Sequence, residues 1–286
     1  MTKAGRDIDE KNRLWQKACT AYEKIDGESY PETKHLIGAF LVRDIANQDY
    51  MGLADDLMYA DTGKNIPKII GSLIVTIYEY EIKENENAWA MNNLGSLYYN
   101  GRTGEKNYEL AMKYYSMSDK AGCALGTENI AYNYYYGLGT EIDYAMAHKY
   151  FTKAAILGRY EGMYKLGDMY RYGHYVDVEP KMVFECYTKA LDLARCDQES
   201  ANVCFGNVFY RIADAYYEGI GVEPSLEIAM SYYQRAELAL YEQIKGGDRY
   251  HMDKIKYVVD KQKEIRERLI VELSLNREIP TEILKF

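Results

Sequence analysis

The chain is poor in cysteine, histidine and proline, and these shortages argue against several kinds of site. Among its 286 residues there are five Cys, four His and five Pro. No two cysteines form a Cys-x-x-Cys pair, which argues against a disulfide framework and against a four-thiolate zinc site. Because the histidines are also scattered singly along the chain, we predict neither a metal site nor a cofactor.

Long hydrophobic runs and an excess of basic residues are missing as well. The most apolar stretches, 36–42 and 69–78, fall far short of the roughly 20 residues that cross a bilayer. The first ten residues lack the apolar segment of a secretory signal. The formal charge is −9, with 44 Asp and Glu against 35 Lys and Arg, which is the wrong sign for neutralising phosphates. We therefore expect a cytoplasmic protein without membrane or nucleic-acid partners.

Tyrosine, in contrast, is abundant. The chain contains 31 Tyr but only six Phe and two Trp. Its buried and contact surfaces therefore depend on aromatic rings whose hydroxyl group needs a hydrogen-bond partner when it is buried. With 48% hydrophobic and 28% charged residues, the composition is otherwise that of an ordinary globular protein.

One sequence pattern occurs four times. The stretch 94–101 (LGSLYYNG) returns as 130–137 (IAYNYYYG), 166–173 (LGDMYRYG) and 212–219 (IADAYYEG), at offsets of 36, 36 and 46 residues. Further columns follow at the same offsets, and they hold small or aromatic residues: Ala111, Ala147, Val183 and Ala229; Tyr115, Phe151, Tyr187 and Tyr233; Ser118, Ala154, Ala190 and Ala236. Columns that stay in register over such a period are typical of a repeat architecture.

The sequence of each repeat predicts two helices, which we call A and B. In the first unit Ala90, Leu94 and Tyr98 recur every four residues, which places them on one face of helix A. A glycine ends the pattern in each unit, as expected where a helix stops in a left-handed conformation. Helix B then starts near an acidic or hydroxyl residue, such as Asp143 or Ser225, because such residues cap helix N-termini.

These residues resemble the Sel-one-like repeats (SLR), relatives of the tetratricopeptide repeats. The second unit is close to the family pattern, with its turn glycines Gly137 and Gly139, followed by Ala147, Phe151 and Gly158. The resemblance covers about residues 86–241. It implies an all-α protein, a right-handed α/α superhelix or solenoid, in which the A-helices line a concave ligand-binding face.

The same register organises the rest of the chain. Residues 1–85 are expected to form N-terminal helices that include one degenerate repeat (51–59 and 66–83), residues 86–244 the four repeats, and residues 245–286 a capping helix, all in one continuous solenoid. We expect few or no strands. An insertion around Cys196 to Cys204 precedes the fourth repeat. It either lengthens two helices or forms a protruding segment that contacts a partner.

Helical geometry selects the candidate binding residues. With Leu94 as the origin, positions 92, 96 and 99 lie about 160°, 200° and 140° around the helix, opposite the buried stripe. Carrying these columns through the four units gives six tyrosines among twelve residues. The predicted partner-binding residues are Tyr99, Tyr132, Tyr135, Tyr164, Arg171, Tyr210, Tyr217, Asp168 and Asp214. Tyrosine and arginine dominate binding hot spots, so this band predicts a groove for a polar peptide or protein segment.

Sequence motifs for catalysis are absent from the chain. It has no G-x-S-x-G elbow, no H-E-x-x-H, no phosphate-binding loop and no Ser-x-x-Lys. The sequence therefore favours a non-catalytic interaction scaffold. Two alternatives stay open: a binder of small molecules or cell-wall fragments that is weakly hydrolytic at most, and homotypic assembly through the C-terminal helix. The oligomeric state is left undetermined by these patterns.

Overall fold

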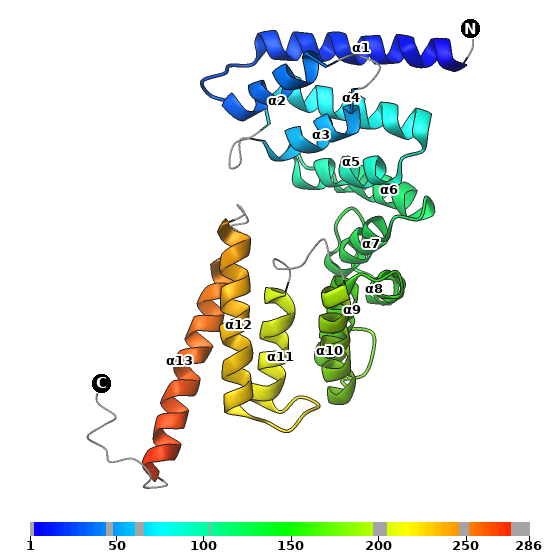
Figure 1. Ribbon diagram of the computed structural model, residues 1–286. Coiled ribbons are helices and arrows are strands. Elements are labelled where there is room, and N and C mark those ends of the chain that lie inside the picture. Colours follow the sequence, from blue (N-terminus) through cyan, green and yellow to red (C-terminus); the bar gives the residue numbers. More distant parts are fainter. Residues whose placement is uncertain are drawn as a thin grey trace. The chain divides into compact units, whose positions relative to one another are not determined.

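The computed structural model describes residues 3–43, 48–60, 66–102, 104–196, 205–245 and 252–275, and every regular element in these ranges is an α-helix (Figure 1). The helices are α1 (Lys3–Lys24), α2 (Pro31–Leu41), α3 (Tyr50–Tyr59), α4 (Lys68–Asn85), α5 (Ala88–Asn100), α6 (Tyr108–Lys120), α7 (Ala124–Tyr136), α8 (Tyr144–Ile156), α9 (Tyr160–Tyr172), α10 (Pro180–Cys196), α11 (Gly206–Glu218), α12 (Leu226–Lys245) and α13 (Met252–Leu275). The prediction of an all-α repeat protein is confirmed. Most of the predicted insertion, residues 197–204, lies outside the described residues.

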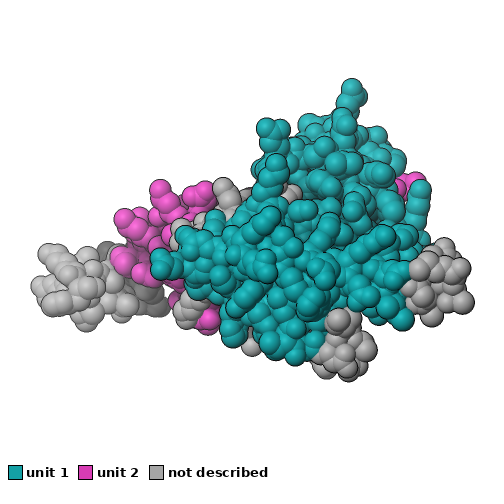
Figure 2. Space-filling model, turned by 90° about the horizontal axis from the view of Figure 1, so that it is seen from above, with its two compact units in different colours: residues 1–147 teal, residues 148–286 magenta. Residues whose placement is uncertain are grey.

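The chain divides into two compact units, Met1–Ala147 and His148–Phe286 (Figure 2). The boundary falls within α8, so the first unit contains α1 to α7 and the second contains α9 to α13. Each unit has its own cluster of buried hydrophobic residues.

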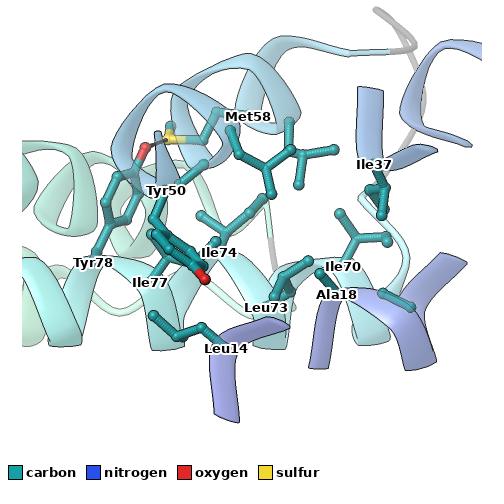
Figure 3. Packing of buried hydrophobic residues seen from close by; sticks show 14 of the residues in the cluster. Leu14, Ala18, Ile37, Tyr50, Met58, Ile70, Leu73, Ile74, Ile77 and Tyr78 are labelled. Carbon is teal, nitrogen blue, oxygen red and sulfur yellow. Dashed lines mark hydrogen bonds between the residues drawn. The ribbon is translucent and has the colours of Figure 1, made fainter. Parts of the chain in front are cut away.

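The core of the first unit is built around α4. Ile70, Leu73, Ile74 and Ile77 recur at helical spacing and are at most 2% exposed. They pack against side chains of α1, α2 and α3, as Figure 3 shows. At the end of this stripe the hydroxyl group of Tyr78 donates a hydrogen bond to Asp55 at 2.7 Å. The buried hydroxyl group of Tyr78 therefore has the hydrogen-bond partner that it needs.

The repeats use the expected helix-ending residues. The A-helices α5, α7, α9 and α11 each end at a glycine with left-handed φ between 65° and 74°. The B-helices α8 and α12 begin where predicted, because Asp143 accepts a hydrogen bond from Met146 N at 2.9 Å and Ser225 accepts one from Ile228 N at 3.2 Å. The turn after α11 also brings chain segments very close together. A Cβ on Gly221, where φ is +68°, would lie 2.1 Å from the carbonyl oxygen of Pro180.

The predicted B-helix columns form the core of the repeats. Their members in α6, α10 and α12 are all at most 2% exposed: Ala111, Tyr115 and Ser118; Val183, Tyr187 and Ala190; Ala229, Tyr233 and Ala236. One position of the A-helices holds only Gly or Ala: Gly95, Ala131, Gly167 and Ala213. This allows the aromatic rings to approach, since a Cβ on Gly167 would lie 2.6 Å from the ring of Tyr187. This part of the sequence prediction is confirmed.

The last of the described helices, α13, packs beside α12 (Figure 1). Ile255, Val258 and Ile265 are buried in the core of the second unit, and Leu269 is partly buried against it. Val259, on the same helix, is 40% exposed. The reason is its position on the helix: it lies one residue beyond Val258, so it points to a side of α13 that α12 does not cover.

Candidate partner-binding surfaces of the A-helices

The predicted groove residues of the second unit join neighbouring A-helices. Arg211 on α11 donates to both carboxylate oxygens of Asp168 on α9, at 2.7 Å each. Its guanidinium group also lies 4.2 Å from the ring centroid of Tyr164 and 4.7 Å from that of Tyr210. A bidentate ion pair flanked by two aromatic rings is a strong and geometrically specific contact.

This ion pair is buried. Asp168 is 5% exposed and Arg211 8%. Burial by itself would raise the pKa of Asp168, but the charges of Arg211 and of Lys165, 3.4 Å away, together with hydrogen bonds, hold that pKa below its ordinary value. Tyr187 contributes one of these hydrogen bonds, at 2.9 Å. Asp168 is thus an ionised, buried carboxylate that is paired with Arg211 and Lys165.

Asp214 is the corresponding carboxylate one repeat later. It accepts hydrogen bonds from Tyr233 at 2.6 Å and Tyr257 at 2.8 Å, and Arg171 lies 3.3 Å away. Burial raises the pKa of Asp214 above its ordinary value, although these partners favour the charged form. Arg171 turns its other nitrogen to Glu218, with distances of 2.8 and 2.9 Å to the two oxygens.

Tyr164, Asp168 and Asp214, which the sequence predicts to bind a partner, are buried, since each is only 5% exposed. Partner binding by these residues stays a prediction. Helical geometry placed them correctly away from the buried stripe of their own repeat. An A-helix in a solenoid, however, also has the next A-helix beside it, and these columns lie between the two. Arg171, Tyr210 and Tyr217 are half-buried and make contacts of the same kind.

The row of A-helices continues into α13. Tyr217 donates a hydrogen bond to Glu264, and Lys254 donates one to Asn207 at 2.7 Å. Lys261 and Arg268 lie over the ring of Tyr217, 4.4 and 4.8 Å from its centroid. The C-terminal helix therefore covers the side of α11 that the sequence analysis assigned to a partner.

In the first unit, asparagine amides are the donors in the contacts between successive helices of this kind. Asn93 on α5 donates a hydrogen bond to Asp55 on α3 at 2.8 Å, and Asn129 on α7 donates one to Asn92 at 2.9 Å. Asn92 is 1% exposed. A row of amides thus replaces the ion pairs of the second unit.

A group of tyrosines in the first unit lies nearer to solvent. Tyr132, Tyr135 and Tyr136 on α7 and Tyr144 at the start of α8 form what we call the tyrosine cluster. The ring of Tyr136 stacks on that of Tyr132 at 6.2 Å and meets that of Tyr135 edge-on at 4.9 Å. Tyr135 meets Tyr144 at 5.3 Å, and the pair Tyr99 and Tyr108 repeats this geometry at 5.4 Å.

The structure also adds a residue that the sequence analysis missed. Tyr136 is 50% exposed and Tyr172, its equivalent in the third repeat, is 58% exposed. Both directly precede the glycine that ends an A-helix. This position could have indicated their exposure from the sequence, because the last side chain before a helix end has no following helical turn to cover it. The predicted residues Tyr99, Tyr132 and Tyr135 are half-buried.

Within the described ranges, no group of three or more His, Cys, Asp or Glu is placed to hold a metal ion. Among the helices described, none is long and apolar enough to span a membrane.

Comparison with known proteins agrees with this repeat geometry. The Sel1 repeat pattern matches residues 90–122, 123–158, 161–194 and 210–238. A search of the curated proteins found no match. Among solved structures, a Sel1 repeat protein from Oxalobacter formigenes is similar at a TM-score of 0.58 and 16% identity, over 87% of this chain and 99% of that one.

A second solved structure has the same fold. It is c5321, a protective antigen present in uropathogenic Escherichia coli strains and displaying an SLR fold, with a TM-score of 0.52 and 21% identity over 90% of this chain. The match covers 53% of that chain, so the present chain spans about half of its length. Four matching repeats, the glycine-ended A-helices and the shared fold place this chain in the Sel1 repeat family, whose members are generally protein-interaction scaffolds.

Proposed function

We propose that this chain is a non-catalytic scaffold that binds a segment of another protein on the tyrosine cluster of its first unit. The observation that carries the proposal is the joined set of rings on α7 and α8, in which Tyr136 is half exposed. Tyrosine side chains offer a large contact area, a polar tip and only two rotatable side-chain angles, which makes them frequent binding hot spots.

The surroundings of the cluster support this role. Ile142, in the turn after α7, is 57% exposed and adds an apolar side chain close to Gly137. The proposed partner segment is polar and contacts the exposed rings of the cluster. Of the residues predicted from sequence, Tyr132 and Tyr135 belong to the cluster and are the ones that this proposal retains.

The experiment is affinity capture from a lysate of the source cell, with the wild type and a Tyr135→Ala/Tyr136→Ala variant as parallel baits. We expect a protein that the wild type retains and the variant loses, while the circular-dichroism spectra and melting temperatures of both baits agree. Identical captured sets would contradict the proposal.

A small-molecule binder is the second candidate, because the first unit contains a cavity of about 560 Å³. Its lining is polar and includes Asp7, Tyr50, Tyr80 and Glu84. A rise in melting temperature across a panel of metabolites and cell-wall fragments, lost in a Tyr80→Ala variant, would support this candidate. No rise with any compound would remove it.

A further inference from the structure

The helix α13 occupies the position of a fifth A-helix. Two contacts join α11 to α13 at the same sequence intervals as two contacts that join α9 to α11. Tyr257 and Asp214 are 43 residues apart, as are Arg211 and Asp168. Tyr217 and Glu264 are 47 residues apart, as are Arg171 and Glu218. Asp168 in α9 and Asp214 in α11 are equivalent residues 46 positions apart, and their partners Arg211 and Tyr257 are also 46 positions apart. Adding 46 to a residue number in α11 therefore gives the equivalent residue in α13.

The four complete repeats show which side of an A-helix receives its own B-helix. A Cβ on Gly95 would lie 2.7 Å from the ring of Tyr115. On α11, a Cβ on Gly206 would lie 2.7 Å from Leu240. The glycine positions 95 and 206 belong to columns that a B-helix covers.

On α13 these two columns hold Val259 and Met252. Val259 is 40% exposed and Met252 is 57% exposed, since no described helix follows α13 to cover them. Ile270, which lies on the same side about three turns beyond Val259, is 41% exposed. The B-helix side of a fifth repeat is thus present and partly apolar, whereas its B-helix is absent from the described part of the chain.

Basic residues flank these apolar side chains. Lys256, Lys263 and Arg266 are exposed and lie on the same side of the helix by its 100° rotation per residue. Within the described residues none of the three is in an ion pair, in contrast to Lys261 and Arg268, which bind Glu264 at 3.0 Å. We call the six residues the uncovered face: Met252, Lys256, Val259, Lys263, Arg266 and Ile270.

We propose that the uncovered face of α13 binds an amphipathic helix of a partner protein, whose apolar stripe is flanked by carboxylates and which takes the place of a fifth B-helix. The apolar side chains would be buried as they are in the other repeats, and the three cations would pair with the carboxylates. This site lies in the second unit and uses no residue of the tyrosine cluster, so either proposal can fail without the other.

The test uses a labelled peptide with the sequence of α12, residues 226–245, carrying Arg235→Glu. This helix already has a face that packs on an A-helix, through Ala229, Tyr233 and Ala236, and the change makes it more acidic. The comparison peptide has all glutamates replaced by glutamine. Fluorescence anisotropy with the full chain should show binding of the acidic peptide at least about tenfold tighter than that of the glutamine peptide.

Variants of the full chain locate the site. Lys263→Glu/Arg266→Glu and Val259→Asp should each weaken binding of the acidic peptide about tenfold or more. The matched control is Ile156→Asp, because Ile156 is a 79% exposed isoleucine of another helix and its replacement should leave the affinity within about twofold. Circular dichroism checks that all variants keep α13 folded. Failure of the acidic peptide to bind, or equal affinity for all variants, would overturn the proposal.

Two further measurements distinguish other occupants of the same face. Sedimentation velocity of the chain alone should show a monomer, and a dimer that Val259→Asp dissociates would assign the face to a second copy instead. A chain ending at residue 275 should bind the peptide as the full chain does. Binding that appears only after this truncation would assign the face to residues 276–286 and overturn the proposal.

Discussion

Tyr257 donates a hydrogen bond to Asp214 at 2.8 Å across the same 43 residues that separate Arg211 from Asp168. A tyrosine hydroxyl on the last helix thus makes the contact that a guanidinium makes one repeat earlier. This equivalence shows that polar contacts between successive A-helices are part of the repeat, and that α13 follows it without any of its sequence signature.

The first prediction concerns the buried ion pair. Asp168→Asn should lower the free energy of unfolding by about 3–5 kcal/mol, because it leaves the buried Arg211 guanidinium without its counter-charge. Urea unfolding followed by circular dichroism measures the effect. Asp177→Asn, at an exposed position of the same unit, is the control and should change stability by less than about 0.5 kcal/mol. Equal effects of the two substitutions would refute this account of Asp168.

The second prediction is that Asp168 and Asp214 respond to pH with opposite signs. The folded-state pKa of Asp168 is lowered, so its charge stabilises the fold above the ordinary aspartate pKa of about 3.9, and this contribution is lost as the pH falls through the lower, folded value. The folded-state pKa of Asp214 is raised, so its ionisation costs stability, and the cost disappears as the pH falls from above the raised value toward about 3.9.

The measurement is the difference in unfolding free energy between the wild type and each asparagine variant from pH 7 to pH 3. The advantage of the wild type over Asp168→Asn should shrink toward the acid end of the series. Its advantage over Asp214→Asn should grow as the pH falls toward 4. Parallel curves for the two variants would show that the charges of these carboxylates have the same role.

The third prediction concerns the turn after α11. Gly221→Ala should destabilise the second unit by more than about 2 kcal/mol, because left-handed backbone strain adds to a Cβ placed 2.1 Å from a carbonyl oxygen. Gly158→Ala is the control, since Gly158 has φ +90° but open space around its Cβ, and it should cost only about 1 kcal/mol. Thermal melts of both variants decide, and a cost at Gly221 no larger than that at Gly158 would rule out the clash.

Sequence patterns predicted the repeats well because they arise from local rules. Backbone geometry and helical periodicity within a single repeat account for three features: the glycines at A-helix ends, the caps Asp143 and Ser225, and the buried B-helix columns. The division of the chain at residues 85 and 244 stays a prediction.

The surroundings of the A-helices could not be predicted in the same way. Angles around a single helix show which side faces its own core, but they do not show that a second A-helix covers Asp168 and Asp214. The sequence also showed no sign that α13 corresponds to an A-helix. Ile265 stands where the other A-helices have their terminal glycine, and the helix continues to Leu275. The burial of Asp168 and Asp214 and the register of α13 both depend on contacts between successive repeats.

The central claim is that the tyrosine cluster binds a partner protein, and its most direct test compares Tyr136→Ala with Tyr172→Ala. The two tyrosines occupy the same repeat position and are similarly exposed, at 50% and 58%, but only Tyr136 belongs to the cluster. Titration calorimetry with the purified partner from the capture experiment should show that Tyr136→Ala weakens binding by about 2 kcal/mol, or roughly 30-fold, while Tyr172→Ala matches the wild type. Equal affinities for all three proteins would contradict the claim.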